Sequence, residues 1–168
     1  MGMTQEQVNI RDKIQGIISD IHDIIDTMID IAVDFVDMQG VPVDELKEKT
    51  KKAYDPLFSK LERETLELME LLRPYGIDNN DVEIIKMAIN ELKDLSIRTY
   101  DAYIYDDFKV GLRFFESIIS LINGETPRFS DGALDQAFND QLIWNLMRLG
   151  YKFITIYETM EKQGKVSK

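Results

Sequence analysis

The chain has 168 residues, of which 31 are acidic and 20 basic, so its formal net charge is −11; it has no cysteine and one histidine, His22. The lack of cysteine excludes disulfides, thiol catalysis and zinc–thiolate or iron–sulfur sites, and one histidine excludes a histidine-rich metal site within the chain. The acidic surplus disfavours direct binding of nucleic acid or of an anionic membrane, and no uncharged apolar run approaches the roughly 20 residues that span a bilayer. We therefore expect one cytoplasmic domain over residues 1–168, with charged partners limited to cations or basic protein surfaces.

The first predicted helix begins near Thr4, which forms a capping-box pattern with Gln7, and ends before Gly40. Between residues 10 and 36 its apolar side chains recur every three or four positions, which is helical spacing. These apolar positions span more than half of the helix circumference, whereas a surface helix needs an apolar stripe only a little over 100° wide. We expect several neighbouring elements to cover this helix.

Six aspartates follow one another along the same helix at intervals of three or four residues, and we name them the aspartate ridge: Asp20, Asp23, Asp26, Asp30, Asp34 and Asp37. Like charges four residues apart cost a few tenths of a kcal/mol each, and no basic residue lies between residues 14 and 38 to offset them. An antiparallel hairpin would bring Lys47 and Lys51 level with the ridge, so interhelical ion pairs are the simplest expectation. A basic partner protein, or a divalent cation shared with acids of another helix, are the alternatives.

The second predicted helix begins at Val43 or Asp44 and extends to Arg73. Pro56 interrupts it, because proline lacks an N–H and disfavours the helical conformation of the preceding residue. We expect a kink or a restart at Asp55.

The third predicted helix has a start signal in Asn80 and Glu83, and its apolar face keeps one direction as far as Tyr103. The apolar residues beyond that point are rotated by more than a third of a turn. One straight helix cannot bury both sets on one side, so we predict a break within Tyr105–Asp107, with one of the two aspartates there capping a fourth helix.

The last predicted helix runs from Ser130 or Asp131 to Lys162, after a turn-rich segment at 123–132 that we expect to be mobile, and before a frayed tail at 162–168. No segment shows the alternation of a strand. The predicted fold class is all-α: an antiparallel bundle of four to five helices, with the third long helix broken.

The last helix carries a second apolar line, separate from its main core line, which we name the aromatic stripe: Trp144, Met147, Tyr151 and Ile154. Its spacing is typical of a helix–helix seam, and Gly150 beside it could permit close approach of a neighbour. Either the helix is buried on two sides, or the stripe is an exposed patch that mediates self-association or partner binding.

Two pairs of acids lie on the second and third predicted helices, Glu67 with Glu70 and Glu91 with Asp94. Their ExxE…ExxD arrangement resembles the motif of the all-α NTP pyrophosphatases of the MazG-like family. The resemblance covers only residues 67–94. It implies that these four acids hold magnesium for the hydrolysis of nucleoside triphosphates.

The pattern as a whole favours a non-enzymatic interaction or assembly protein that uses the aromatic stripe either to form a homo-oligomer, most simply a homodimer, or to bind a protein partner, which could be basic. One alternative is the magnesium-dependent pyrophosphatase; the other is an acidic mimic of nucleic acid whose aspartate ridge blocks a basic protein. Serine, histidine and aspartate are scattered along the chain, so the sequence predicts no catalytic triad, and there is no glycine-rich phosphate loop. We expect no metal or cofactor outside the magnesium alternative.

Overall fold

The computed structural model describes residues 5–126 and 134–164, and this part of the chain contains five α-helices and no strand. The helices are α1 (Gln5–Val36), α2 (Val43–Leu72), α3 (Asn79–Ser96), α4 (Ala102–Ser120) and α5 (Asp140–Lys162), with short 3₁₀ helices η1 (Arg73–Tyr75), η2 (Leu121–Asn123) and η3 (Leu134–Gln136). The predicted all-α class is confirmed. None of the described helices is long and apolar enough to cross a membrane.

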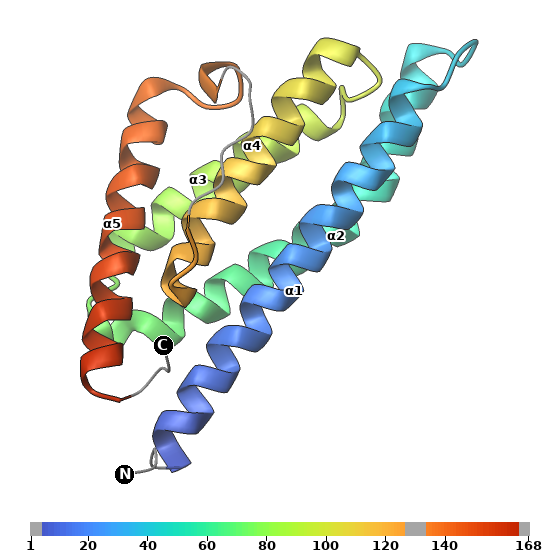
Figure 1. The fold of residues 1–168 in the computed structure, drawn as a ribbon. Coiled ribbons are helices and arrows are strands. Elements are labelled where there is room, and N and C mark those ends of the chain that lie inside the picture. The colour runs from blue at the N-terminus through green and yellow to red at the C-terminus, as the bar shows by residue number, and fades with distance from the viewer. Residues whose placement is uncertain (1–4, 127–133, 165–168) are drawn as a thin grey trace.

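Helices α1 to α4 form an up-and-down bundle in which each helix is antiparallel to the next (Figure 1). Contacts join α1 to α2, α2 to α3, α3 to α4 and α4 back to α1, so the four helices close a ring. Helix α5 packs on α3, α4 and η2, on the side away from α1 and α2. It is therefore a fifth helix added to one flank of a four-helix bundle.

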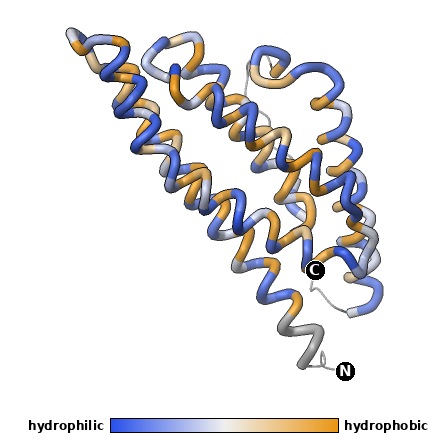
Figure 2. The backbone as a smooth tube through the Cα atoms, turned by 180° about the vertical axis from the view of Figure 1, so that it is seen from behind, coloured by the Kyte–Doolittle hydropathy of each residue, from blue (hydrophilic) through white to orange (hydrophobic). Residues whose placement is uncertain are grey.

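The wide apolar arc of α1 is buried because α2 and α4 both pack against it. Hydrophobic and hydrophilic residues alternate along this helix as they do along the others (Figure 2). Its fully or nearly buried residues run along most of its length: Ile14, Ile17, Ile18, Ile21, Ile24, Ile25, Met28, Ile29, Ala32 and Phe35. The prediction that this helix needs several neighbours is confirmed.

An aromatic cluster joins three helices in the core. The ring of Tyr54 lies 5.5 Å from Phe108, 6.1 Å from Phe35 and 6.4 Å from Phe58, measured between centroids. Its hydroxyl lies 3.4 Å from Thr99 Oγ1, in the connection between α3 and α4. This cluster ties α1, α2 and α4 to that connection.

The break between the third and fourth helices lies at residues 97–101, and the predicted position within Tyr105–Asp107 is wrong. Asp101 caps α4 by accepting a hydrogen bond from the N–H of Tyr103, at 2.9 Å. The error has a specific cause: Tyr103 is 83% exposed and belongs to the first turn of α4, not to the apolar face of α3. The Asp101 cap therefore determines where α4 starts, although the spacing of Tyr103 resembles that of a core residue of α3.

Three other predicted boundaries also differ. Helix α2 continues through Pro56 as one helix, because this proline is exposed and water can solvate the carbonyl that loses its partner. Helix α3 starts two residues early, from a capping box in which Asp78 and Asp81 satisfy each other's N–H groups. Helix α5 starts at Asp140, because Asn139 caps it. The predicted start at 130–131, most of the 123–132 loop and most of the 162–168 tail lie outside the described residues.

An ion pair fastens α5 to the start of α3. Lys152 Nζ lies 2.5 Å from Asp81 Oδ2 and 3.6 Å from Asp78 Oδ2. Burial lowers the pKa of Lys152, but the hydrogen bond and charge of Asp81 outweigh it and raise that pKa overall. The capping box of α3, of which Asp81 is buried, therefore also holds α5.

Candidate interaction face and polar pocket

The aromatic stripe lies on the outer face of α5. The core residues of this helix, from Leu142 to Met160, face α3 and α4, and the stripe is roughly on the opposite side of the helix. Trp144 is 67% exposed, Tyr151 69% and Met147 41%, while Ile154 is partly buried. Of the two alternatives left by the sequence, burial on both sides is excluded.

Glycine at position 150 lets α5 approach its neighbours closely, as the sequence suggested. A Cβ added there would lie 3.0 Å from Leu121 Cδ1 and 3.1 Å from Ile118 Cδ1, which is tighter than ordinary van der Waals contact. Further along, the ring of Tyr157 packs on Gly124, whose φ of +76° suits glycine. These contacts pack the inner side of α5 closely against α4 and the segment after it.

The outer face of α5 differs in charge from the rest of the protein. Its exposed residues between positions 141 and 155 are Gln141, Trp144, Met147, Arg148, Tyr151 and Thr155. None is acidic, although the chain has a net charge of −11. Between these two positions the face is apolar at its centre and neutral to weakly basic beside it, and the exposed acids Asp140 and Glu158 lie just beyond its two ends.

The six aspartates of the ridge are all exposed. Among the described residues, no ion pair joins the ridge to Lys47 or Lys51, so that expectation is wrong. Instead, Asp26 forms an ion pair with Arg113 of α4. Asp20, another aspartate of the ridge, interacts with Glu64 of α2. The sequence does not indicate a pairing with Arg113, because nothing in it shows that α4 packs beside α1.

The four acids of the ExxE…ExxD pattern are exposed on α2 and α3: Glu67, Glu70, Glu91 and Asp94. Within the described residues, no three acidic or histidine side chains are grouped as a metal ion would require. The structure thus gives the magnesium-site interpretation no assembled ligand set.

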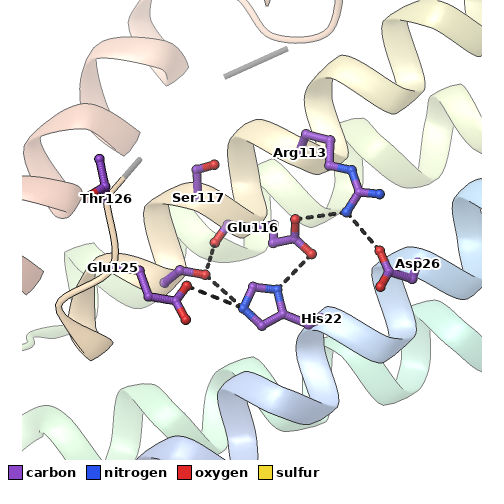
Figure 3. A pocket seen from close by; sticks show the side chains of 8 residues that line it. His22, Asp26, Arg113, Glu116, Ser117, Glu125 and Thr126 are labelled. Carbon is purple, nitrogen blue, oxygen red and sulfur yellow. Dashed lines mark hydrogen bonds and ion pairs between the residues drawn. The ribbon is translucent and has the colours of Figure 1, made fainter. Parts of the chain in front are cut away.

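A polar cavity of about 500 Å³ lies where α1, α4 and the segment after η2 meet (Figure 3). All of its lining side chains are polar or charged: His22, Asp26, Arg113, Glu116, Ser117, Ser120, Glu125 and Thr126. The size is typical of a small-molecule site, but such sites are usually lined mainly by apolar groups. Any ligand of this cavity would have to be polar.

His22 is at the centre of the contacts in this cavity. Its Nδ1 lies 2.9 Å from Glu116 Oε2, and its Nε2 lies 3.2 Å from Ser120 Oγ and 3.6 Å from Glu125 Oε2 (Figure 3). Glu116 is largely buried, with a side chain 12% exposed. The imidazole therefore connects a serine hydroxyl on one nitrogen with a buried carboxylate on the other.

Arg113 fixes the buried carboxylate from its other side. Its Nη1 donates to Glu116 Oε1 at 3.0 Å and to Asp26 Oδ1 at 2.8 Å. Burial lowers the pKa of Arg113, but the hydrogen bonds to Asp26 and Glu116 outweigh it and raise that pKa. This guanidinium remains charged and holds α1 to α4.

The sequence predicted no triad, because His22 and its partners on α4 are more than 90 residues apart. One signal was present: Glu116 and Ser120 are four residues apart, so both lie on one face of a helix and can meet one imidazole. The sequence does not show that α4 packs against α1, and this packing brings His22 to Glu116 and Ser120.

The chain matches no protein-family model, and neither a curated protein nor a solved structure matches it.

Proposed function

We propose that this protein is an interaction module that forms a homodimer through the aromatic stripe of α5. The observation that carries the proposal is the exposure of Trp144 and Tyr151, two large aromatic side chains that lie two turns apart on the same side of α5. Tryptophan and tyrosine dominate the energetic centres of interfaces, because they bury a large area with few rotatable bonds.

The spacing of the stripe supports a second copy of the chain as the partner. The four positions are separated by three, four and three residues, and this order reads the same in both directions. A second α5 running antiparallel would therefore meet the first in register, with Trp144 opposite Ile154 and Met147 opposite Tyr151. Such a self-complementary contact is what a two-fold symmetric dimer requires.

Charge and size support the same partner. Two copies of an acidic protein repel each other least where their surfaces lack acid, and positions 141–155 of α5 expose none. Each aromatic side chain buries about 150–250 Å² when fully covered, so the contact lies near the small end of specific interfaces, about 1,200 Å² in total. We expect a dimer with micromolar affinity.

Light scattering coupled to gel filtration at increasing protein concentration tests the proposal. The expected mass rises from 19.5 kDa toward twice that value as the concentration passes through the micromolar range. Trp144→Asp with Tyr151→Asp should hold the protein at the monomer mass, because each copy then contributes two charges to an apolar seam.

Tyr103→Asp is the matched control. Tyr103 is even more exposed than either stripe residue but lies at the start of α4, outside the stripe. It should leave dimerisation unchanged. A wild-type protein that stays monomeric at several hundred micromolar, or a dimer that the double variant leaves intact, would overturn the proposal.

A further inference from the structure

We propose that Ser120, His22 and Glu116 form a nucleophile–base–acid relay that hydrolyses small esters in the polar cavity. The proposal concerns α1 and α4, and it is independent of the dimer contact on α5. It rests on the order of the three groups: a hydroxyl at Nε2 of the imidazole and a carboxylate at Nδ1. This is the arrangement by which a histidine removes the proton of a serine while an acid orients the histidine, whatever the fold that carries it.

The distances lie within reach of proton transfer. Ser120 Oγ is 3.2 Å from His22 Nε2, and His22 Nδ1 is 2.9 Å from Glu116 Oε2. The acid is itself held in place, because Arg113 donates to its other oxygen at 3.0 Å. All three groups line one cavity that is large enough for a small substrate.

Two details of the resting arrangement must change before reaction. The hydroxyl of Ser120 also lies 2.7 Å from the carbonyl of Glu116, to which it can donate, so its hydrogen must rotate toward Nε2. Glu116 Oε2 has no aligned hydrogen-bond donor despite its distance to Nδ1, so the imidazole ring must turn to point its N–H at that oxygen. Both are rotations about single bonds, and contacts of this kind are often poorly aligned before substrate binds.

The reaction is balanced with water as the only co-reactant. Ser120 Oγ attacks the carbonyl carbon of the ester, and its proton passes to His22 Nε2. The bond to the leaving alcohol breaks, and His22 returns the proton to that oxygen. A water molecule, deprotonated by the same nitrogen, then releases the acid from Ser120 and restores the serine.

The surroundings of Nε2 set the substrate class. Glu125 Oε2 lies 3.6 Å from Nε2, so Glu116 and Glu125 would both stabilise the imidazolium that forms during reaction. The same acids repel anionic substrates, which leaves neutral or cationic esters.

A fluorophosphonate probe tests the nucleophile without any substrate, because an activated serine displaces its fluoride and keeps the phosphonate. Mass spectrometry of the digested wild-type protein should place a stoichiometric label on Ser120. Hydrolysis of p-nitrophenyl acetate should fall at least 100-fold in Ser120→Ala and in His22→Gln. Glu116→Gln, a change at a positioning residue, should lower kcat at unchanged KM.

Ser96→Ala is the matched control. Ser96 is buried in α3 and donates to a carbonyl of its own helix, as Ser120 does, but has no imidazole beside it. Ser96 of the wild-type protein should not take up the label, and Ser96→Ala should hydrolyse p-nitrophenyl acetate at the wild-type rate. Thermal melts establish that each variant is folded.

The charge of the substrate gives a further readout. Acetylthiocholine should be hydrolysed at least tenfold faster than the anionic 4-acetoxybenzoate. No label on Ser120, or rates equal in Ser120→Ala and wild type, would overturn the proposal.

Discussion

Single glycines determine how closely α5 approaches the rest of the bundle. Gly150 is buried against Ile118 and Leu121, whereas Gly16 of α1 is exposed, with no atom within 4 Å of an added Cβ. Close packing requires glycine at position 150 but not at position 16, and substitutions at the two positions should therefore change stability in opposite directions.

Gly150→Val should lower the free energy of unfolding by about 1–3 kcal/mol, because the added methyl groups overlap packed side chains. Gly16→Ala should raise it by about 0.5–1 kcal/mol, because alanine is the better residue in an open helix interior. Urea denaturation measures both. A Gly150→Val protein as stable as wild type would contradict the close contact of α5 with η2.

At the scale of elements, Tyr54 joins α2 to the connection between α3 and α4. Burial raises the pKa of Tyr54 to about 12; the hydrogen bond to Thr99 acts against this, and the charges of Tyr105 and Asp34 add to it. The folded value lies above the unfolded value of 10.0. The stability gained from the neutral, buried phenol is therefore present below pH 10 and is lost as the pH rises through about 12.

Absorbance at 295 nm during an alkaline titration should show one of the seven tyrosines ionising near pH 12 while the protein is still folded. Tyr54→Phe should remove that component. The same variant should be less stable by about 0.5–1.5 kcal/mol at pH 7, because the hydrogen bonds of the hydroxyl are lost, and the difference should shrink above pH 10. A late component that persists in the variant would show that another tyrosine is the buried one.

The elements themselves were predictable from the spacing of apolar residues, but their ends were not. The sequence correctly predicted the Ile-rich helix α1 and the residue range of α2, because each of these predictions depends on many residues. The starts of α3, α4 and α5 depend on single caps, Asp78, Asp101 and Asn139, and several neighbouring residues could serve as well in sequence. Only packing decides which of them is used.

At the scale of the whole molecule, the acidic surplus leaves some carboxylates in unfavourable places. Burial and the charges of Asp20 and Glu67 raise the pKa of Glu64. A raised value means that the fold favours the protonated form. The stability that protonated Glu64 contributes is therefore complete below its unfolded pKa of 4.5 and is lost as the pH rises through its folded pKa.

Glu64→Gln should accordingly stabilise the protein at pH 7 by a few tenths of a kcal/mol, because it removes like-charge repulsion between α1 and α2. The gain should disappear below pH 4. Glu62→Gln, at an exposed position on another side of the same helix, is the control. Melting temperatures across this pH range measure the effect, and an equal gain in both variants would point to net charge rather than to the contact with Asp20.

The exposed stripe of α5 was visible in the sequence as one of two alternatives, since a second apolar line on a helix must face either a neighbour or water. The polar cavity was not visible, because its parts come from α1, from α4 and from the segment after η2. Sequence spacing relates residues within one helix. The contact between His22 and Glu116 depends on the order in which the helices pack.

That α4 closes the bundle against α1 also has a consequence for synthesis. The hairpin of α1 and α2 is complete once residue 72 has been made, yet the part of α1 that faces α4 stays uncovered until about residue 120. At about 5–20 residues per second, the wait lasts several seconds. During that interval the Ile-rich surface is bordered by the aspartate ridge, whose charges repel the hairpins of neighbouring nascent chains. We expect the ridge to act as a gatekeeper against aggregation on the ribosome.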